Sequence, residues 1–465
     1  ALIFSIYPMI ADKVPIYFLQ GQSFDFLTTA RNHALSSNSI IGIPFQTVGS
    51  LLIGFLVFGV VLQYTGGGNF FFNLAQSLFG RARGGPAKVA VVSSALMGMM
   101  SGSAVSNVLT TGSMTIPAMK KAGYHPEYAA GIEATAATGG SITPPIMGSA
   151  AFIMASLLGI PYAEIALAAA IPAFLYYLGI FVQVDGYAAK VGLHGASKED
   201  IPGFFPTLKS GWYYLISLVV LVYLLVTLRA EAQAPFYAIL FLILVAVLKK
   251  TDRMNWSGFR EMIIQSGKTL SEIVGIIAGV GLIVGGLSVT GVSLSFSREL
   301  VVAVGDNVFL ILVAGALTSF ILGMGMTVSA VYVFLAIVMA PALVELGINP
   351  IAAHLFVIYW ATISYITPPV ALASFAARAA RRLGRLAGIA GTSPMRTGLM
   401  AMKLGMVKYV VPFLFVINPS LVAQGPWLDV LYNLVTAIIG VILMASAVEG
   451  WLVGVGRLKH WFFRI

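Results

Sequence analysis

Long apolar stretches separated by short polar connections run along the whole chain. A stretch of about 18 to 20 apolar residues is long enough to cross a bilayer as a helix. The stretches of this length are residues 47–65, 162–184, 210–230, 233–250, 271–293 and 427–447. A shorter apolar run lies near 405–417, and the amphipathic segments 70–85 and 256–269 are expected to lie in the membrane interface. The pattern predicts an all-α polytopic membrane protein.

Two apolar regions are interrupted near their middle and do not fit a single span. Residues 86–119 are broken at MSGSAVSN, and residues 308–345 are broken at GMGMTVS, so each limb is too short to cross. Lysines and arginines lie close to the ends of the first region but not of the second, which places their ends on opposite sides of the membrane. We therefore predict two re-entrant helical hairpins whose tips point at each other.

The chain contains an internal repeat around two proline pairs. The motif ITPP begins at residue 142, within TGGSITPPI, and again at residue 366, within TISYITPPV. Without a gap, the offset between these two positions also superposes Pro117 on Pro341, Gly123 on Gly347, Pro126 on Pro350, Thr138 on Thr362 and Ser103 on Thr327. Each half thus predicts a hairpin, a short loop and a helix broken at TPP. Inverted repeats with broken helices are typical of secondary transporters, whose sites lie between the breaks.

The two breaks supply oxygen atoms in an apolar setting. A proline pair removes two amide donors and frees carbonyls about one turn earlier, and those groups need a partner in protein or a bound ion. Together with nearby hydroxyls they predict two cation sites. The first comprises Ser101, Ser103 and Ser106 at the tip, and Thr138, Gly140, Ser141 and Thr143 at the break. The second comprises Gly323, Gly325 and Thr327 at the tip, and Thr362, Ser364 and Thr367 at the break. A packing kink without an ion is the alternative.

Three further polar residues are candidates in apolar surroundings. Asn107, just past the first tip, could bind a substrate carboxylate or cap the second limb of the hairpin. Glu133, ahead of the first break, predicts proton or ion coupling, unless it pairs with a lysine or reaches water. We expect His354 to be a hydrogen-bonded structural residue.

Composition excludes several classes of function. Hydrophobic residues make up 58% of the chain and charged residues 9%, which excludes a water-soluble core. The net charge of +10 reflects basic residues at segment ends and indicates membrane topology, not a nucleic-acid partner. There is no cysteine, no HExxH metal motif and no phosphate-binding loop, so we expect no enzyme and no cofactor apart from a coupling ion. The alternative from another class is a passive channel.

Residues 84–154, GGPAKVAVVSSALMGMMSGSAVSN through ITPPIMGSAAFIMA, closely resemble the large membrane subunit of tripartite ATP-independent periplasmic (TRAP) transporters. They are most similar to the version that is fused to the small membrane subunit and paired with TAXI-type solute-binding proteins. The segment AGIAGTSPMRTG, residues 387–398, resembles the same group.

The resemblance implies an elevator-type transporter with a scaffold and a moving domain, in a bacterial or archaeal inner membrane. It implies that a periplasmic binding protein delivers an organic acid and that sodium drives uptake; with proton coupling, Glu133 is the candidate carrier. The family's sodium sites match Ser103, Gly140 and Thr143 in the first half, and Gly325, Thr327, Ser364 and Thr367 in the second half.

Two departures from the family accompany the predicted division of the chain. Residues 1–46 are expected to hold a remnant of the fused small subunit and a connecting segment, so that most of that subunit is missing. The first repeat is then 47–230, the second 231–417, and residues 418–465 form a last helix and tail. The segment RAARRLGRL, residues 378–386, is expected to be a basic insertion, because its four arginines would be costly within a membrane helix.

Overall fold

The computed structural model describes residues 1–248, 254–293, 307–369, 371–379 and 392–458, together with residues 295, 298, 299 and 302. Almost every element is a helix; the short strands β1 (Trp451–Leu452) and β2 (Gly456–Arg457) pair near the C-terminus. Among the described residues, six helical segments are long and apolar enough to cross a membrane: Ile43–Tyr64, Tyr162–Val191, Phe204–Val226, Trp256–Val289, Pro394–Ile417 and Trp427–Glu449. The predicted helical membrane fold is confirmed.

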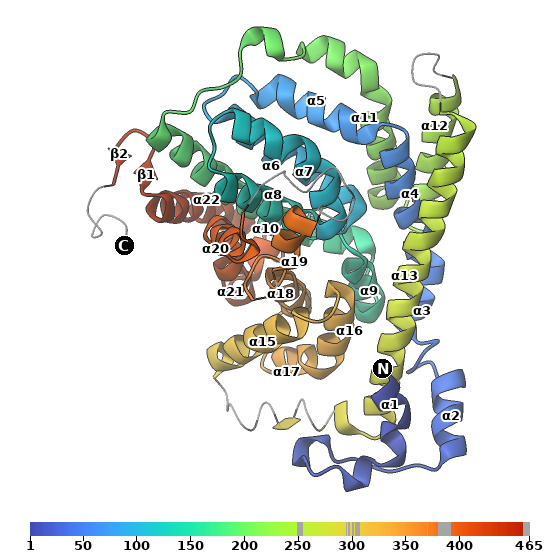
Figure 1. Ribbon diagram of the computed structural model, residues 1–465. Coiled ribbons are helices and arrows are strands. Elements are labelled where there is room, and N and C mark those ends of the chain that lie inside the picture. The colour runs from blue at the N-terminus through green and yellow to red at the C-terminus, as the bar shows by residue number, and fades with distance from the viewer. Residues whose placement is uncertain are drawn as a thin grey trace.

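The N-terminal segment and the first half supply these elements in chain order (Figure 1). They are α1 (Leu2–Ile6), η1 (Tyr7–Met9), η2 (Ala11–Lys13), η3 (Tyr17–Leu19), α2 (Phe26–Leu35), α3 (Ile43–Thr47), η4 (Val48–Leu52), α4 (Ile53–Tyr64), α5 (Gly67–Phe79), α6 (Gly85–Ser101), α7 (Ala104–Lys121), α8 (Pro126–Gly140), α9 (Ser149–Leu158), α10 (Tyr162–Val191), η5 (Lys198–Asp200), α11 (Phe204–Val226) and α12 (Ala234–Leu248). The amphipathic segment 70–85 forms most of α5.

The second half follows a similar order. It contains α13 (Trp256–Val289), α15 (Val308–Gly323), α16 (Val328–Val338), α17 (Ala340–Glu345), α18 (Pro350–Ile363), α19 (Leu372–Ala379), α20 (Pro394–Leu404), α21 (Val407–Ile417), η7 (Pro419–Val422) and α22 (Trp427–Glu449). The expectation of a separate interfacial piece at 256–269 is wrong. Asn255 caps a single helix that continues to Val289, because no proline interrupts it.

Both predicted hairpins form as pairs of helices joined by a tight turn. Gly102 ends α6 with a left-handed φ of 61°, and the Ser103 hydroxyl caps α7 by accepting from the Ser106 amide at 3.3 Å. In the second hairpin the Thr327 hydroxyl caps α16 in the same way, accepting from the Ala330 amide at 3.4 Å. Each cap satisfies an amide that the first helical turn leaves free. The two capping residues are a pair that the sequence repeat superposes.

The two helix breaks also match in three dimensions. α8 ends at Gly140 before the first proline pair, and α18 ends at Ile363 before the second. Met147 and Ala371, which the repeat offset also relates, take the left-handed conformation, and both Pro–Pro peptides are cis. The repeat is therefore a repeat of backbone structure and not only of residue types.

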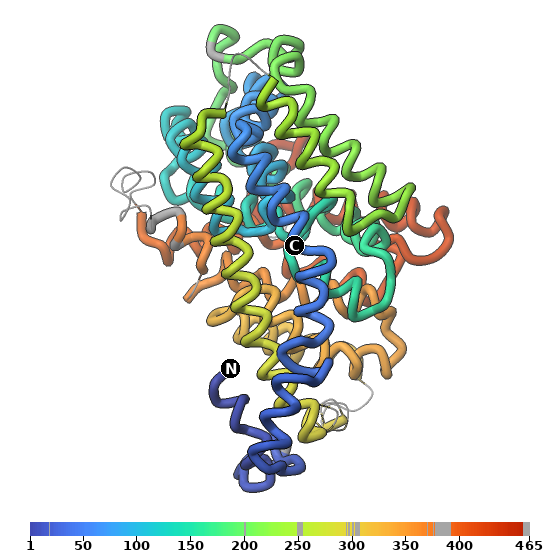
Figure 2. Tube along the Cα trace, turned by 90° about the vertical axis from the view of Figure 1, so that its right-hand side faces the viewer, coloured from blue at the N-terminus to red at the C-terminus, as the bar shows by residue number. Residues whose placement is uncertain are grey.

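The helices before the breaks, α8 and α18, form the centre of the molecule. Almost all of their residues are buried; the first hairpin packs on α8 and the second on α18. Helices α4 and α13 contact each other and run along one edge of the molecule (Figure 1), where the turned view shows them close together (Figure 2). This edge, together with α11 and α12, flanks the two hairpins and the breaks. His354 of α18 is buried and hydrogen-bonded to the Tyr332 hydroxyl at 2.7 Å, as a structural histidine should be.

Candidate functional site

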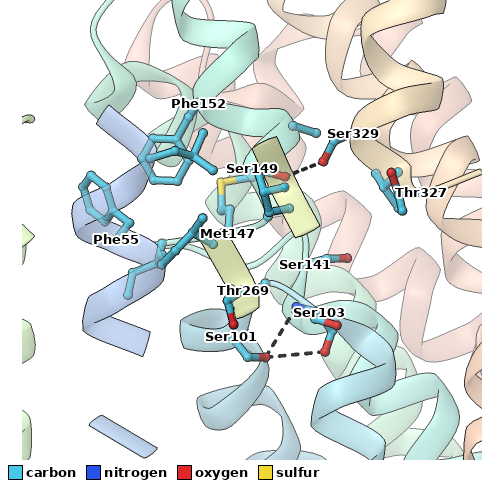
Figure 3. Close-up of a pocket in the computed structure, with 18 of the residues that line it drawn as sticks. Phe55, Ser101, Ser103, Ser141, Met147, Ser149, Phe152, Thr269, Thr327 and Ser329 are labelled. Carbon is cyan, nitrogen blue, oxygen red and sulfur yellow. Dashed lines mark hydrogen bonds between the residues drawn. The ribbon is translucent and has the colours of Figure 1, made fainter. Parts of the chain in front are cut away.

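A cavity of about 150 Å³ lies where the two hairpin tips and the first break meet the edge formed by α4 and α13 (Figure 3). Residues 101–103 come from the first tip, 146–150 from the first break and α9, and 327–329 from the second tip. The opposite wall consists of Leu52, Phe55 and Leu56, and of Thr269, Glu272, Ile273 and Ile276. Both tips therefore face one cavity, as the repeat predicted.

Three helices begin at this cavity. Ser103 caps α7, Ser149 is the first residue of α9, and Thr327 caps α16, and each of these three residues lines the cavity. A helix N-terminus carries free amides and a partial positive charge, so it attracts anions. Among the described residues that line the cavity there is no lysine, arginine or histidine, and Glu272 is the one charged side chain. The positive potential here comes from the backbone.

A direct hydrogen bond connects the two halves of the chain at the cavity. The hydroxyl of Ser149, at the start of α9, bonds to the hydroxyl of Ser329 in the first turn of α16 (Figure 3). On another side of the cavity the Ser101 hydroxyl accepts from the Ser103 amide at 3.4 Å and stabilises the first tip. The sequence did not point to Ser149 or Ser329, because neither interrupts a pattern.

The residues predicted for the first cation site divide into two groups. Ser101, Ser103 and Ser141 line the cavity. Thr138 and Thr143 donate their hydroxyls to carbonyls of their own turn, those of Ala134 and Gly139, both at 2.7 Å. Thr143 also lines a second, mostly apolar pocket on the other side of the break, with Tyr177 and Phe181.

Gly140 serves a close approach of two helices. A Cβ atom at Gly140 would lie 2.3 Å from the Cα atom of Gly98 in α6, so only two glycines allow this crossing. The tip of the first hairpin is thereby held directly against the end of α8. Ser106 donates its amide to the Ser103 cap, and its place is at the first turn of α7.

In the second half, Thr327 lines the cavity and Gly325 lies in the turn between α15 and α16. Ser364 connects break and tip, because its hydroxyl donates to the Gly323 carbonyl at 2.9 Å. Thr362 donates to the Tyr359 carbonyl at 2.7 Å, and Thr367 donates to the Ile363 carbonyl at 2.8 Å while bonding to the Tyr409 hydroxyl. A hydroxyl that donates to a carbonyl keeps lone pairs with which it can hold a cation.

Behind the first tip, Asn107 and Glu133 belong to one buried polar cluster. Asn107 donates to the Ser94 carbonyl at 2.8 Å and is 2% exposed, so the expectation that it caps α7 is wrong; Ser103 occupies that position. It does not line the main cavity. The Glu133 carboxylate accepts hydrogen bonds from Ser94 at 3.2 Å, from Thr115 at 2.5 Å and from Thr111.

The structure also reveals Lys408, which the sequence reading passed over. It lies on α21 with 0% exposure; its Nζ atom is 3.5 Å from the Thr138 carbonyl and 5.2 Å from the centre of the Tyr176 ring. The available signal was one lysine inside the apolar run 405–417. Of the basic insertion at 378–386, all but the first two residues lie outside the described residues.

Helices that span a membrane, arranged as two repeats around a central cavity, define a multi-pass transport protein. The structure resembles the YdaH transporter from Alcanivorax borkumensis with a TM-score of 0.61 over 91% of this chain and 98% of that one, at 16% identity. The fold is therefore shared with a known transporter. Residues 2–427 match the family model of the tripartite ATP-independent periplasmic transporter, DctM component, and the chain belongs to this family.

Curated relatives carry the same description. The C4-dicarboxylate TRAP transporter large permease DctM of Pseudomonas aeruginosa is 25% identical over 72% of this chain and 76% of its own length. The sialic acid TRAP transporter large permease SiaM of Vibrio cholerae is also 25% identical, over 72% and 76%. The isethionate permease DctMQ of Oleidesulfovibrio alaskensis is 22% identical over 76% of this chain and 54% of its own. The relatives are permeases and not enzymes, and membership implies a solute-binding protein and a small membrane subunit as partners.

Proposed function

We propose that this chain is the permease of a sodium-driven elevator transporter that imports an organic acid across a bacterial or archaeal inner membrane. A TAXI-type solute-binding protein delivers the acid, and the small membrane subunit, normally fused, completes the scaffold. The observation that carries the proposal is the pair of matched breaks and tips, related by one sequence offset, that converge on one cavity.

The cavity supports an anionic substrate. Three helix N-termini face it, at Ser103, Ser149 and Thr327, and their amides can bind a carboxylate without a basic side chain. A volume of about 150 Å³ holds about five water molecules, which favours a small acid. Relatives named for C4-dicarboxylate, sialic acid and isethionate transport all act on organic anions.

The breaks support a cation as the coupling partner. Carbonyls at the ends of α8 and α18 lie at the negative ends of helix dipoles, and the hydroxyls of Thr143 and Thr367 stand beside them. Sodium prefers such neutral oxygens, and the remaining predicted residues at each break and tip supply more of them. The close contacts Gly98 to Gly140 and Ser364 to Gly323 tie each tip to its break, so binding an ion at the break can order the tip.

The two walls of the cavity support an elevator movement. One wall consists of hairpins and breaks, and the other of the long helices α4 and α13, which contact each other. Movement of the first wall along the second would carry the cavity across the membrane while the tips open in turn.

Reconstituted uptake tests this function. The permease, its small subunit and the binding protein are placed in liposomes with an imposed sodium gradient and a labelled C4-dicarboxylate. Accumulation above the external concentration that requires sodium and the binding protein supports the proposal. Equilibration without sodium contradicts it and indicates a passive channel.

Replacing the break threonines locates the ion. Thr143→Val and Thr367→Val keep the shape and remove one oxygen, so we expect a lower apparent sodium affinity in at least one variant. Thr318→Val is the matched control, because Thr318 also donates to a carbonyl of its own helix, that of Ala314 at 2.8 Å, but lies exposed on α15. Sodium affinity unchanged in both break variants would leave these residues with a packing role.

Glu133 favours a second candidate, proton coupling. Its carboxylate is fully buried on α8, and the donors that it contacts are the hydroxyls of Ser94, Thr111 and Thr115. A carboxyl group without a cationic partner among the described residues can take up and release a proton. Uptake that acidifies the liposome interior, and does so less in Glu133→Gln, would favour the proton; sodium-dependent uptake that Glu133→Gln leaves intact would reject it.

A further inference from the structure

Lys408 is a buried lysine for which the described residues offer no carboxylate partner. The side chain is 0% exposed, and its Nζ atom lies within hydrogen-bonding reach of a carbonyl group instead, that of Thr138 at 3.5 Å. An ionisable side chain inside a membrane protein is costly, so its place calls for a function. Lys408 lies on α21, whereas the carbonyl belongs to the last turn of α8 at the first break.

The surroundings of Lys408 Nζ are those of a cation site. The Thr138 carbonyl lies at the C-terminal end of α8, where the helix dipole is negative. The face of the Tyr176 ring is 5.2 Å away, within the range of a cation–π interaction. Ser141, another residue predicted for the first cation site, donates its hydroxyl to the same carbonyl at 2.9 Å. The ammonium therefore lies beside Thr138 and Ser141, two of the oxygen-bearing residues of that site.

The second break has neutral groups in the corresponding place. The Gly323 carbonyl accepts from the Ser364 hydroxyl, and Thr367 bonds to the Tyr409 hydroxyl. No lysine or arginine contacts these groups in the described part of the chain. The two breaks share one backbone geometry but differ in charge, and Lys408 makes the difference.

We propose that the Lys408 ammonium is a tethered cation that takes the place of a transported sodium ion at the first break. Sodium then binds only at the second break, and each transport cycle moves one sodium ion fewer than two equal sites would. The inference rests on the proposed sodium coupling and specifies its stoichiometry. A fixed cation neutralises the end of α8 in every step of the cycle, whereas a sodium ion would leave.

Sodium binding to the purified chain in detergent tests this role without transport. Thermal stability is measured against sodium chloride at constant ionic strength, with choline as the replacement, for the wild type, Lys408→Met and Lys209→Met. The last is the matched control, because Lys209 lies exposed on α11. We expect a Hill coefficient near one for the wild type and the control. Lys408→Met should bind an additional sodium ion, with a Hill coefficient that rises toward two.

The outcomes separate this inference from the proposed function. A folded Lys408→Met with the sodium response of the wild type overturns the role of Lys408. A wild type without any sodium response contradicts sodium coupling, but a response gained in Lys408→Met would still support the tethered cation. If Lys408→Met does not fold, Ser141→Ala and Ser364→Ala decide: loss of sodium affinity in Ser364→Ala alone supports the proposal, and loss in Ser141→Ala overturns it.

Discussion

The hydroxyl of Ser149 is hydrogen-bonded to the hydroxyl of Ser329, which lies 180 residues further along the chain. The first residue starts the helix after the first break, and the second lies in the first turn of α16, just after the second hairpin tip. The bond therefore joins the first repeat to the second at the wall of the cavity. A substrate bound between the tips would have to share or replace it.

This contact predicts an efficient cross-link in an otherwise cysteine-free chain. Ser149→Cys combined with Ser329→Cys should form a disulfide under mild oxidation, because the two side chains touch. Blocking of maleimide–polyethylene glycol labelling measures its formation. Substrate should slow the reaction by separating the residues. Ser149→Cys with Thr318→Cys, on the outer surface of α15, is the negative control; equal rates for both pairs would contradict the contact.

Gly59 sets how closely α4 approaches the first hairpin. A Cβ atom there would lie 2.5 Å from the Met100 carbonyl oxygen, so Gly59→Ala should disfavour this arrangement by about 1–3 kcal/mol. If the hairpin moves along α4, the variant will populate the other state more. We expect faster labelling of a cysteine placed at Ser101 and slower transport. Gly49→Ala, with open space around its Cβ, is the control, and identical labelling in both would argue against movement at this contact.

Glu272 is the charged side chain in the cavity wall and repels an anionic substrate. Glu272→Gln should lower the KM for an organic acid about fivefold, since a like charge at about 4 Å in water costs about 1 kcal/mol. Glu261→Gln makes the same change in net charge on the exposed start of α13. A lowered KM in both variants would indicate general electrostatics, and a raised KM in Glu272→Gln alone would show that the carboxylate contacts the substrate favourably.

Glu449 holds three helices together at the end of α22. Its carboxylate is 1% exposed and pairs with Lys190 of α10 at 2.6 Å and Lys403 of α20 at 2.7 Å. Glu449→Ala would leave both lysines without this partner, so we expect a loss of about 3 kcal/mol of stability, seen as a lower thermal midpoint. Lys190→Met should cost less, because Lys403 still pairs. Glu164→Ala, exposed on α10, should change little; an equal loss there would mean that the pairing is unimportant.

The repeat could be predicted because it is written in residue types with strong local effects. Proline pairs end α8 and α18, and a hydroxyl residue at each tip caps the helix that follows. These effects act over short distances along the chain, so one common offset was enough to predict hairpins and breaks in both halves. The continuity of α13 was missed, because amphipathic character at 256–269 says where a helix lies and not where it ends.

The sequence alone determined the class of the chain, its helical spans and the positions of the breaks, since hydrophobic length and proline chemistry are local properties. Tertiary structure decided which polar groups meet. It placed Ser149 against Ser329, moved Asn107 away from the cavity and brought Lys408 to the carbonyl of Thr138, 270 residues away. Such pairings depend on how α21 packs on α10 and α18 and on how the tips converge, and no spacing along the chain encodes that packing.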